Sequence, residues 1–247
     1  MNLDLTSRMW LAIALGLGAG AGNVLGGLFV VHREWPRRYL TYFLALGAGF
    51  MLAASLLEML PESIHLAGDS ALLSVLAGYF LVHFFEHTLA PHFHFGEETH
   101  TDAMRGHHAS ASALLGLAIH TFFDGVAIAS GFLVSGGLGL LIFVAVVLHK
   151  LPEGFTVSSL ILAGGSSRRA ALLGSAALGA ATVSGVLLTG LLHAAVAYTL
   201  PVSAGVTLYV AATDLIPEVN RERGVGMAIL VFLGVALLFL FEKLLHV

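Results

Sequence analysis

Two short motifs combine histidine and carboxylate side chains at a spacing that suits metal binding. The first is His120-x-x-x-Asp124, the second is His149-x-x-x-Glu153, and a glycine follows each. Residues four apart lie on the same face of a helix, one turn from each other. The sequence therefore predicts two pairs of ligands, each pair on one helix face.

If the two faces meet, two imidazoles and two carboxylates surround one point, a set that suits Zn²⁺, Fe²⁺, Mn²⁺ or a similar divalent ion. The chain has no Cys, which excludes a thiolate site for soft metals. The alternative is that these side chains only hydrogen-bond one another where helices pack. Because four ionisable groups are costly to bury in lipid without a function, we favour metal binding.

The composition places these motifs in a membrane protein. Of the 247 residues, 57% are hydrophobic and only 11% are charged, against about 25% charged in soluble domains. So few charges cannot cover a soluble fold of this size, which excludes a soluble enzyme, a disordered chain and a nucleic-acid binder. The chain also has 13 His, and so many in a hydrophobic chain are typical of proteins that transport metal ions or protons.

Apolar stretches of about 20 residues predict eight membrane-spanning helices. Frequent Gly, Ala and Ser favour close helix packing, and no strand alternation is visible. We therefore predict an all-α polytopic membrane protein with a single transporter domain over residues 1–247. The link between the sixth and seventh stretches is short, so seven spans is the alternative. The predicted spans are residues 10–31, 39–59, 70–90, 109–134, 138–162, 170–193, 199–219 and 225–244.

Basic residues predict the orientation of the spans. Eight of the 11 Lys and Arg lie in the links after spans 1, 3, 5 and 7, and the other links have none. The positive-inside rule places these links in the cytoplasm and both termini outside the cell (inner) membrane, the lipid bilayer that the chain crosses several times. The eight are Arg33, Arg37, Arg38, Arg105, Arg168, Arg169, Arg221 and Arg223.

A repeat relates the two halves of the chain. Residues 48–62 and 204–218 share Ala, Gly, Leu, Pro and Glu at the same offsets. They lie on spans 2 and 7, which must cross the membrane in opposite directions, as in the inverted repeats of transporters. We predict a repeat of spans 1–3 and 6–8 around spans 4 and 5. The alternative is that Leu-Pro-Glu is merely a common end for an apolar helix.

The repeat also carries four acids along a predicted transport pathway. Glu58 and Glu62 would face the outer entrance, and Asp214 and Glu218 the cytoplasmic exit. We expect them to hold the ion transiently. For Glu62 and Glu218 the alternative is a solvated helix end.

With these motifs, the chain resembles a ZIP (Zrt/Irt-like) divalent metal transporter of the bacterial type over its whole length. The resemblance implies transport of zinc, the cargo we expect first, or of iron, manganese or cadmium toward the cytoplasm. It also implies a metal centre on spans 4 and 5, an elevator-type carrier movement and a homodimer. The metal is then the transported substrate, and no organic cofactor is expected.

Two residues depart from the family pattern. Many relatives hold two metal ions, with an Asn after the first His, an acid after the second and a Glu on span 6. Here the first two positions are Thr121 and Lys150, and span 6 has no acid. We therefore predict a single metal site in which Lys150 pairs with Asp124 or Glu153. The alternative is that Lys150 extends to the membrane interface.

Many other histidines lie around the predicted cytoplasmic loop, residues 91–108. Such a run binds metal weakly and acts as a buffer or sensor, or else is dispensable for transport. The candidates are His83, Glu86, His87, His92, His94, His100, His107 and His108.

Two other functions stay open. His83-x-x-Glu86-His87 fits the inverted zinc-peptidase pattern, which predicts an intramembrane metallopeptidase. That hypothesis leaves the motifs on spans 4 and 5 unexplained, so we predict that the chain is not an enzyme. A passive metal channel is the second alternative. No Walker motif is present, which argues against an ATP-driven pump.

Overall fold

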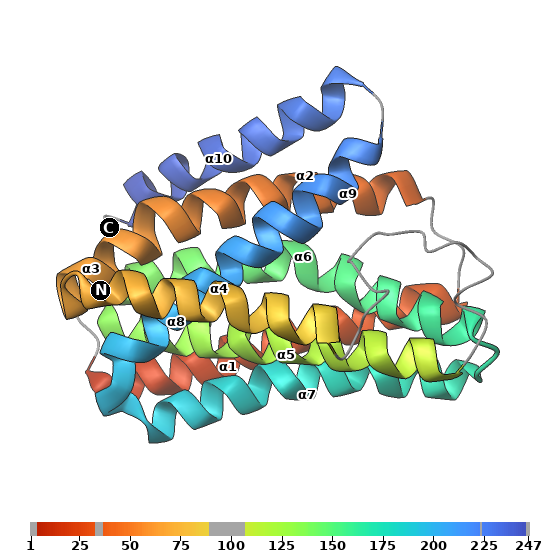
Figure 1. Cartoon of the computed structure of the whole chain (residues 1–247), viewed down its shortest axis with the longest axis horizontal. Coiled ribbons are helices and arrows are strands. Elements are labelled where there is room, and N and C mark those ends of the chain that lie inside the picture. Colours follow the sequence, from red (N-terminus) through yellow and green to blue (C-terminus); the bar gives the residue numbers. More distant parts are fainter. Residues whose placement is uncertain (1–3, 33–36, 89–106, 223, 246–247) are drawn as a thin grey trace.

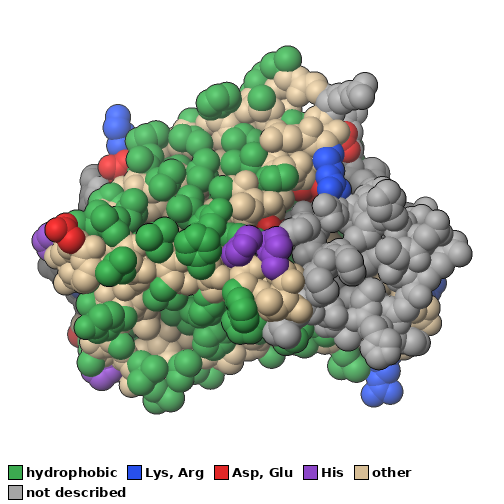
Figure 2. Space-filling view, in the orientation of Figure 1, with side chains coloured by type: hydrophobic (Ala, Val, Ile, Leu, Met, Phe, Trp, Pro, Cys, Tyr) green, Lys and Arg blue, Asp and Glu red, His purple; other side chains and the backbone are tan. Residues whose placement is uncertain are grey.

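The computed structural model of the chain describes residues 4–32, 37–88, 107–222 and 224–245, and these form a bundle of helices without strands (Figure 1). Eight of the helical stretches described are long and apolar enough to cross a membrane, which confirms the predicted count. Hydrophobic side chains cover much of the described surface seen in Figure 2, and few charged side chains interrupt them. Such a surface suits contact with lipid.

Two spans contain more than one helical element. Span 2 consists of α2, the π-helix η1 and α3, and span 7 consists of the 3₁₀ turn η2, α8, the π-helix η3 and α9. The elements are α1 (Leu5–His32), α2 (Arg37–Ala53), η1 (Ala54–Met59), α3 (Leu60–Ala67), α4 (Ser70–Thr88), α5 (His107–Val134), α6 (Gly136–Ala163), α7 (Arg168–Leu191), η2 (His193–Ala195), α8 (Val196–Tyr209), η3 (Val210–Leu215), α9 (Ile216–Arg221) and α10 (Val225–Leu245).

Tight turns reverse the chain between α3 and α4 and between α6 and α7. Gly68 between α3 and α4 has φ 62°, and Gly165 between α6 and α7 has φ 84°, conformations that glycine adopts without a steric penalty. Helix α1 begins and α10 ends at the left of Figure 1, while α1, α4, α6 and α9 end toward the right. The links that follow these four helices in the sequence are the ones that carry the arginines.

Four helices, α1, α5, α6 and α7, form what we call the central bundle. Glycines let their backbones touch: a Cβ on Gly26 of α1 would overlap the Leu151 carbonyl oxygen of α6, and a Cβ on Gly185 of α7 would overlap the Phe122 carbonyl oxygen of α5. Small residues at helix crossings allow this close approach in membrane proteins.

The remaining spans, α2–η1–α3, α4, α8–η3–α9 and α10, form what we call the outer layer. A Cβ on Gly49 of α2 would overlap the Val231 carbonyl oxygen of α10, and a Cβ on Gly205 of α8 would overlap the Val75 carbonyl oxygen of α4. The two contacts use equivalent residues: Gly205 lies 156 positions after Gly49, and Val231 lies 156 positions after Val75. Equivalent packing of α2 on α10 and of α8 on α4 supports the predicted inverted repeat.

The π-helices occupy equivalent places in this repeat. In η1 the Leu60 N–H donates to the Ser55 carbonyl, and in η3 the Ile216 N–H donates to the Ala211 carbonyl, five residues back in each case. A proline, Pro61 or Pro217, directly follows. A proline ring clashes with the carbonyl four residues earlier in an α-helix, and a wider turn relieves that clash.

Candidate metal centre

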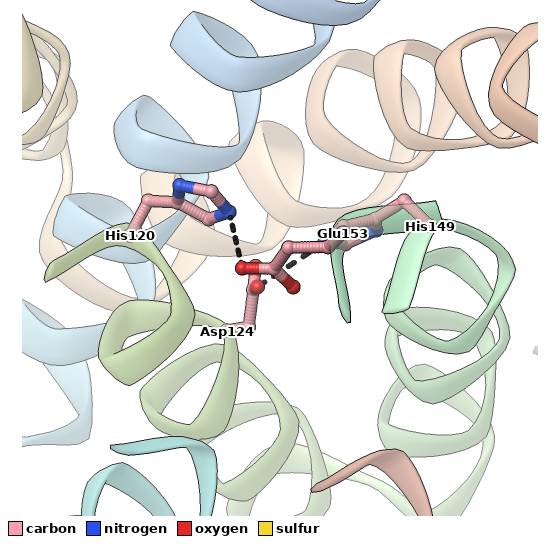
Figure 3. A group of neighbouring side chains, drawn as sticks. All are labelled: His120, Asp124, His149 and Glu153. Carbon is pink, nitrogen blue, oxygen red and sulfur yellow. Dashed lines mark hydrogen bonds and ion pairs between the residues drawn. The ribbon is translucent and has the colours of Figure 1, made fainter. Parts of the chain in front are cut away.

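The structure brings the two predicted ligand pairs together inside the central bundle. His120 and Asp124 of α5 face His149 and Glu153 of α6, and none of the four is more than 2% exposed (Figure 3). Each of the four side chains offers one ligand atom, and these atoms all lie within 4.8 Å of one another. It is the one such group of three or more His, Cys, Asp or Glu among the residues described.

Each histidine contacts the acid of the other motif. His120 Nε2 lies 3.2 Å from Glu153 Oε1, and His149 Nε2 lies 3.2 Å from Asp124 Oδ2. These contacts link α5 to α6 at two points. The spacing of each motif fixes its two side chains on one helix face, and the packing of the two helices then produces the crossed pairs.

Several atoms of the group lack a hydrogen-bond partner, as expected for atoms that face a cation. Asp124 Oδ1 is buried without one, and so is His120 Nε2, whose contact with Glu153 does not have hydrogen-bond geometry. His149 Nδ1 lies 3.2 Å from the Ala145 carbonyl, which can only accept a hydrogen bond. Nε2 lies 3.2 Å from Asp124 Oδ2, which as a carboxylate oxygen also only accepts, so the ring donates to both oxygens when it carries a proton on each nitrogen. A neutral ring with its proton on Nδ1 would leave Nε2 to a metal ion, an arrangement typical of metal-binding histidines.

Glycines and a proline position the two ligand helices. A Cβ on Gly125 would overlap the Thr182 carbonyl oxygen of α7, and a Cβ on Gly154 would overlap the Asn23 carbonyl oxygen of α1. The residue after each acid must therefore be small. Pro152 lies within α6 beside the group, where its missing N–H interrupts the helix ladder.

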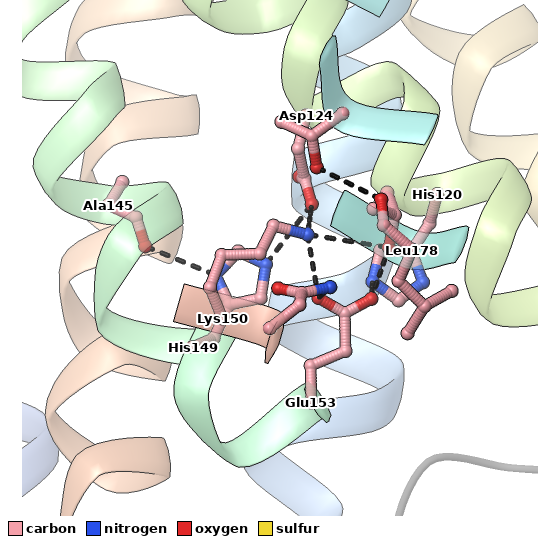
Figure 4. Close-up of polar contacts among 10 residues, drawn as sticks. His120, Asp124, Ala145, His149, Lys150, Glu153 and Leu178 are labelled. Atoms are coloured by element: carbon pink, nitrogen blue, oxygen red, sulfur yellow. Dashed lines mark hydrogen bonds and ion pairs between the residues drawn. The ribbon is translucent and has the colours of Figure 1, made fainter. Parts of the chain in front are cut away.

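Lys150 lies between the two acids. Its Nζ is 2.6 Å from Asp124 Oδ2, 2.6 Å from Glu153 Oε2 and 3.3 Å from Thr121 Oγ1 (Figure 4). The predicted pairing with one acid is thus a bridge between both. The side chain is fully buried, so the alternative that Lys150 extends to the membrane interface is wrong.

Two further polar side chains contact Glu153. The Thr121 hydroxyl donates to Glu153 Oε1, and Asn23 Nδ2 of α1 donates to Glu153 Oε2 over 3.3 Å. The sequence reasoning did not single out Asn23. The sequence contains a feature that could have identified it: Asn23 is the one carboxamide side chain within the first span, and the chain has no Gln.

The predicted pathway acids lie in the outer layer, in the two equivalent segments of the repeat. Glu58 in η1 is half-buried and close enough to Glu242 of α10 to interact with it electrostatically. Glu62 lies in α3, 3.8 Å from His65. In α9, Glu218 lies 3.4 Å from Arg221.

The fourth acid, Asp214 in η3, has a different environment. It is 1% exposed and lies against Glu86 of α4. The Tyr209 hydroxyl donates to Glu86 Oε2 over 2.8 Å. Asp214 and Glu86 thus form a second buried acidic pair, in the outer layer.

The His83-x-x-Glu86-His87 motif is divided between two environments. Glu86 is buried against Tyr209, whereas His83 and His87 are exposed, with ring centroids 4.0 Å apart. His87 Nδ1 lies 2.9 Å from the His83 carbonyl oxygen. The three do not converge on one point as zinc-peptidase residues must. Of the other predicted histidines, His92, His94 and His100 and the side chains of His107 and His108 lie outside the described residues.

Comparison with known families gives an independent match. The sequence model of the family described as ZIP Zinc transporter matches residues 92–242, more than half of the chain. This region includes the four clustered residues and spans 4 to 7, together with most of span 8.

Individual relatives carry the same description. Zinc transporter ZIP9-B of Xenopus laevis is 25% identical over 88% of this chain and 86% of its own length. Zinc transporter ZIP4 of Homo sapiens is 35% identical over 44% of this chain and 17% of its own length. Zinc transporter ZIP13 homolog of Drosophila melanogaster is 32% identical over 51% of this chain and 38% of its own length. The chain thus aligns with less than half of the length of the last two.

Proposed function

The chain belongs to the ZIP zinc transporter family, and from that membership we propose that it carries divalent metal ions, Zn²⁺ first, across a membrane. The observation that carries this proposal is the buried group of two imidazoles and two carboxylates in the central bundle. Zn²⁺ prefers four such nitrogen and oxygen ligands. The same ligands accept Fe²⁺, Mn²⁺ and Cd²⁺, which we include as further cargo.

We assign a single ion to this site. The ammonium group of Lys150, between Asp124 and Glu153, takes the place of a second cation. The single ion binds at the remaining atoms of the group, such as Asp124 Oδ1, which has no hydrogen-bond partner. Lys150 keeps its contacts with Asp124 Oδ2 and Glu153 Oε2 and so holds the two acids together.

We propose that the cytoplasm lies at the end where α1, α4, α6 and α9 terminate, because the links that follow these helices in the sequence carry the arginines. Transport then runs from the side of both termini toward the cytoplasm. Glu58 and Glu62 act on the outer half of the path, and Asp214 and Glu218 on the inner half. The histidines near residues 91–108 buffer the delivered ion.

We propose an elevator-type movement, with the central bundle as the moving part and the outer layer as its support in a homodimer in the cell membrane. Close glycine contacts hold each group together, such as Gly26 on Leu151 within the bundle and Gly49 on Val231 within the layer. Between the groups, a Cβ on Gly47 of α2 would lie 3.4 Å from Leu148 Cβ of α6, an ordinary van der Waals contact. Surfaces in such contact can slide past each other.

Crosslinking tests this movement directly, because the chain has no Cys of its own. The 3.4 Å separation at Gly47 and Leu148 is close to the Cβ–Cβ distance of a disulfide, about 3.8 Å. We expect the oxidised Gly47→Cys/Leu148→Cys protein to lose zinc uptake, and dithiothreitol to restore it.

The matched control is a disulfide that joins two helices of the central bundle. A Cβ on Gly16 of α1 would lie 3.6 Å from Val186 Cβ of α7, so the Gly16→Cys/Val186→Cys pair should crosslink without loss of uptake. Equal uptake in the oxidised and reduced forms of the Gly47 pair, with the crosslink verified by mass spectrometry, would rule out the elevator.

Uptake of ⁶⁵Zn²⁺ into proteoliposomes tests the function itself and its two alternatives. We expect saturable uptake, which Glu153→Gln abolishes and Glu86→Gln retains, because only Glu153 belongs to the four-residue group. If Glu86→Gln abolishes activity and Glu153→Gln leaves it intact, the peptidase hypothesis replaces the transporter. Flux that rises linearly with the zinc gradient would indicate a channel.

A further inference from the structure

Asn23 is a buried amide of α1 whose hydrogen-bonding capacity is only partly used. The side chain is fully buried, and Nδ2 donates to Glu153 Oε2 over 3.3 Å. Oδ1 is also buried and has no hydrogen-bond partner. An unpaired amide oxygen inside a membrane protein is costly, and such groups mark functional positions.

The backbone around Asn23 is fixed against the ligand helix α6. A Cβ on Gly154 would overlap the Asn23 carbonyl oxygen, and a Cβ on Gly26 would overlap the Leu151 carbonyl oxygen. The backbone of Asn23 therefore cannot move away from α6 without separating the two helices. The side chain can still rotate, and a half turn about the Cβ–Cγ bond exchanges the positions of Oδ1 and Nδ2.

The inverted repeat supplies a counterpart for comparison. Thr182 of α7 approaches Gly125 through its carbonyl oxygen, as Asn23 approaches Gly154. The Thr182 hydroxyl donates within its own helix, to the Leu178 carbonyl over 3.4 Å. Of the two equivalent residues, Asn23 therefore has a side-chain oxygen without a hydrogen-bond partner, whereas the Thr182 hydroxyl has one.

We propose that Asn23 Oδ1 is a fifth ligand of the metal site and that it determines which ions the site accepts. The inference rests on the proposed transport function and extends it. In the structure the amide donates to Glu153. When the ion arrives, the amide turns and presents Oδ1 to it, adding a neutral oxygen from a third helix.

Coordination chemistry says which ions gain from this ligand. Zn²⁺ is satisfied by four ligands, which His120, Asp124, His149 and Glu153 supply. Mn²⁺ favours octahedral oxygen-rich sites, and amide carbonyls are among its preferred ligands. Asn23 therefore broadens the site from a zinc site toward one that also holds Mn²⁺.

Calorimetric titration of the purified full-length protein with ZnCl₂ and with MnCl₂ tests the proposal. Asn23→Leu, of similar size but without an oxygen, should raise the ratio of the Mn²⁺ to the Zn²⁺ dissociation constant about tenfold, as for one lost interaction of about 1.4 kcal/mol. Asn23→Asp keeps an oxygen and should leave the ratio close to that of the parent. Thr182→Val, at the equivalent position, is the matched control and should not change it.

X-ray absorption at the manganese edge counts the atoms that coordinate the ion, a number that would not change if Asn23 had a purely structural role. The first shell should lose one oxygen or nitrogen neighbour in Asn23→Leu and keep the parent number in Thr182→Val. If Asn23→Leu does not fold, Asn23→Ser serves instead, because its hydroxyl is too short to reach the ion.

Two results with Asn23→Leu would overturn the proposal. The first is an equal loss of affinity for Mn²⁺ and Zn²⁺, which would mean that Asn23 only positions Glu153. The second is no change in either affinity. Failure of the proposed function has another signature, namely a parent protein that binds neither metal, or an Asp124→Ala protein that binds both as the parent does.

Discussion

Replacement of Asp124 by alanine is expected to abolish saturable zinc uptake. Asp124 Oδ2 contacts both His149 Nε2 and Lys150 Nζ, and Oδ1 has no hydrogen-bond partner. Loss of a residue that merely orients a metal ligand weakens binding about 10–100-fold. Loss of the ligand itself should therefore weaken zinc binding by about 100-fold or more, which calorimetry and ⁶⁵Zn²⁺ uptake measure together.

The same replacement should destabilise the metal-free protein. It leaves the buried Lys150 ammonium with Glu153 as its one remaining carboxylate partner. Breaking a buried ion pair from one side costs about 3–5 kcal/mol, so the melting temperature should fall. Asp124→Asn keeps the shape and one oxygen and should fall between the parent and Asp124→Ala in both stability and affinity.

The matched control is Asp69→Ala, which removes an exposed acid from the turn between α3 and α4. It should retain uptake and stability. Uptake by Asp124→Ala at the parent level, from protein that elutes as a folded species, would remove Asp124 from the metal site.

Replacement of Lys150 by alanine is expected to change the number of ions bound from one to two. The ammonium group lies 2.6 Å from an oxygen of each acid. Its removal leaves two buried carboxylates without a cation and opens space for a second ion. Calorimetric stoichiometry should therefore rise from one Zn²⁺ per chain in the parent to two in Lys150→Ala.

Stability should follow the same electrostatics. Without metal, Lys150→Ala should melt well below the parent, because like charges remain close in a buried site. Zinc should raise its melting temperature more than that of the parent, since the ion now supplies all of the compensating charge. Lys150→Arg, which keeps the charge, is the control and should still bind one ion. A parent protein that itself binds two ions would contradict the single-ion proposal.

Much of the architecture follows from the sequence because it depends on local chemistry. An apolar run of about 20 residues forms a spanning helix whatever its neighbours are, so eight spans could be counted before any packing was known. Spacing of four residues places two side chains on one helix face, which is why His120 with Asp124 and His149 with Glu153 were found as pairs.

The contacts between helices depend instead on which faces meet. The crossed pairs, His120 with Glu153 and His149 with Asp124, follow from the way α5 packs on α6. Asn23 joins the site because glycines let the backbone of α1 touch that of α6. Glu86 of span 3 lies beside Tyr209 and Asp214 of span 7, although three other spans separate these segments in the sequence.

Sequence alone therefore determined the membrane class, the spans, the four candidate ligands and the family resemblance, because composition, length and periodicity are properties of one segment at a time. Tertiary structure decided that Lys150 bridges both acids and that a third helix contributes an amide. Those features arise where backbones from distant parts of the chain come within a few ångströms, and no local pattern encodes that approach.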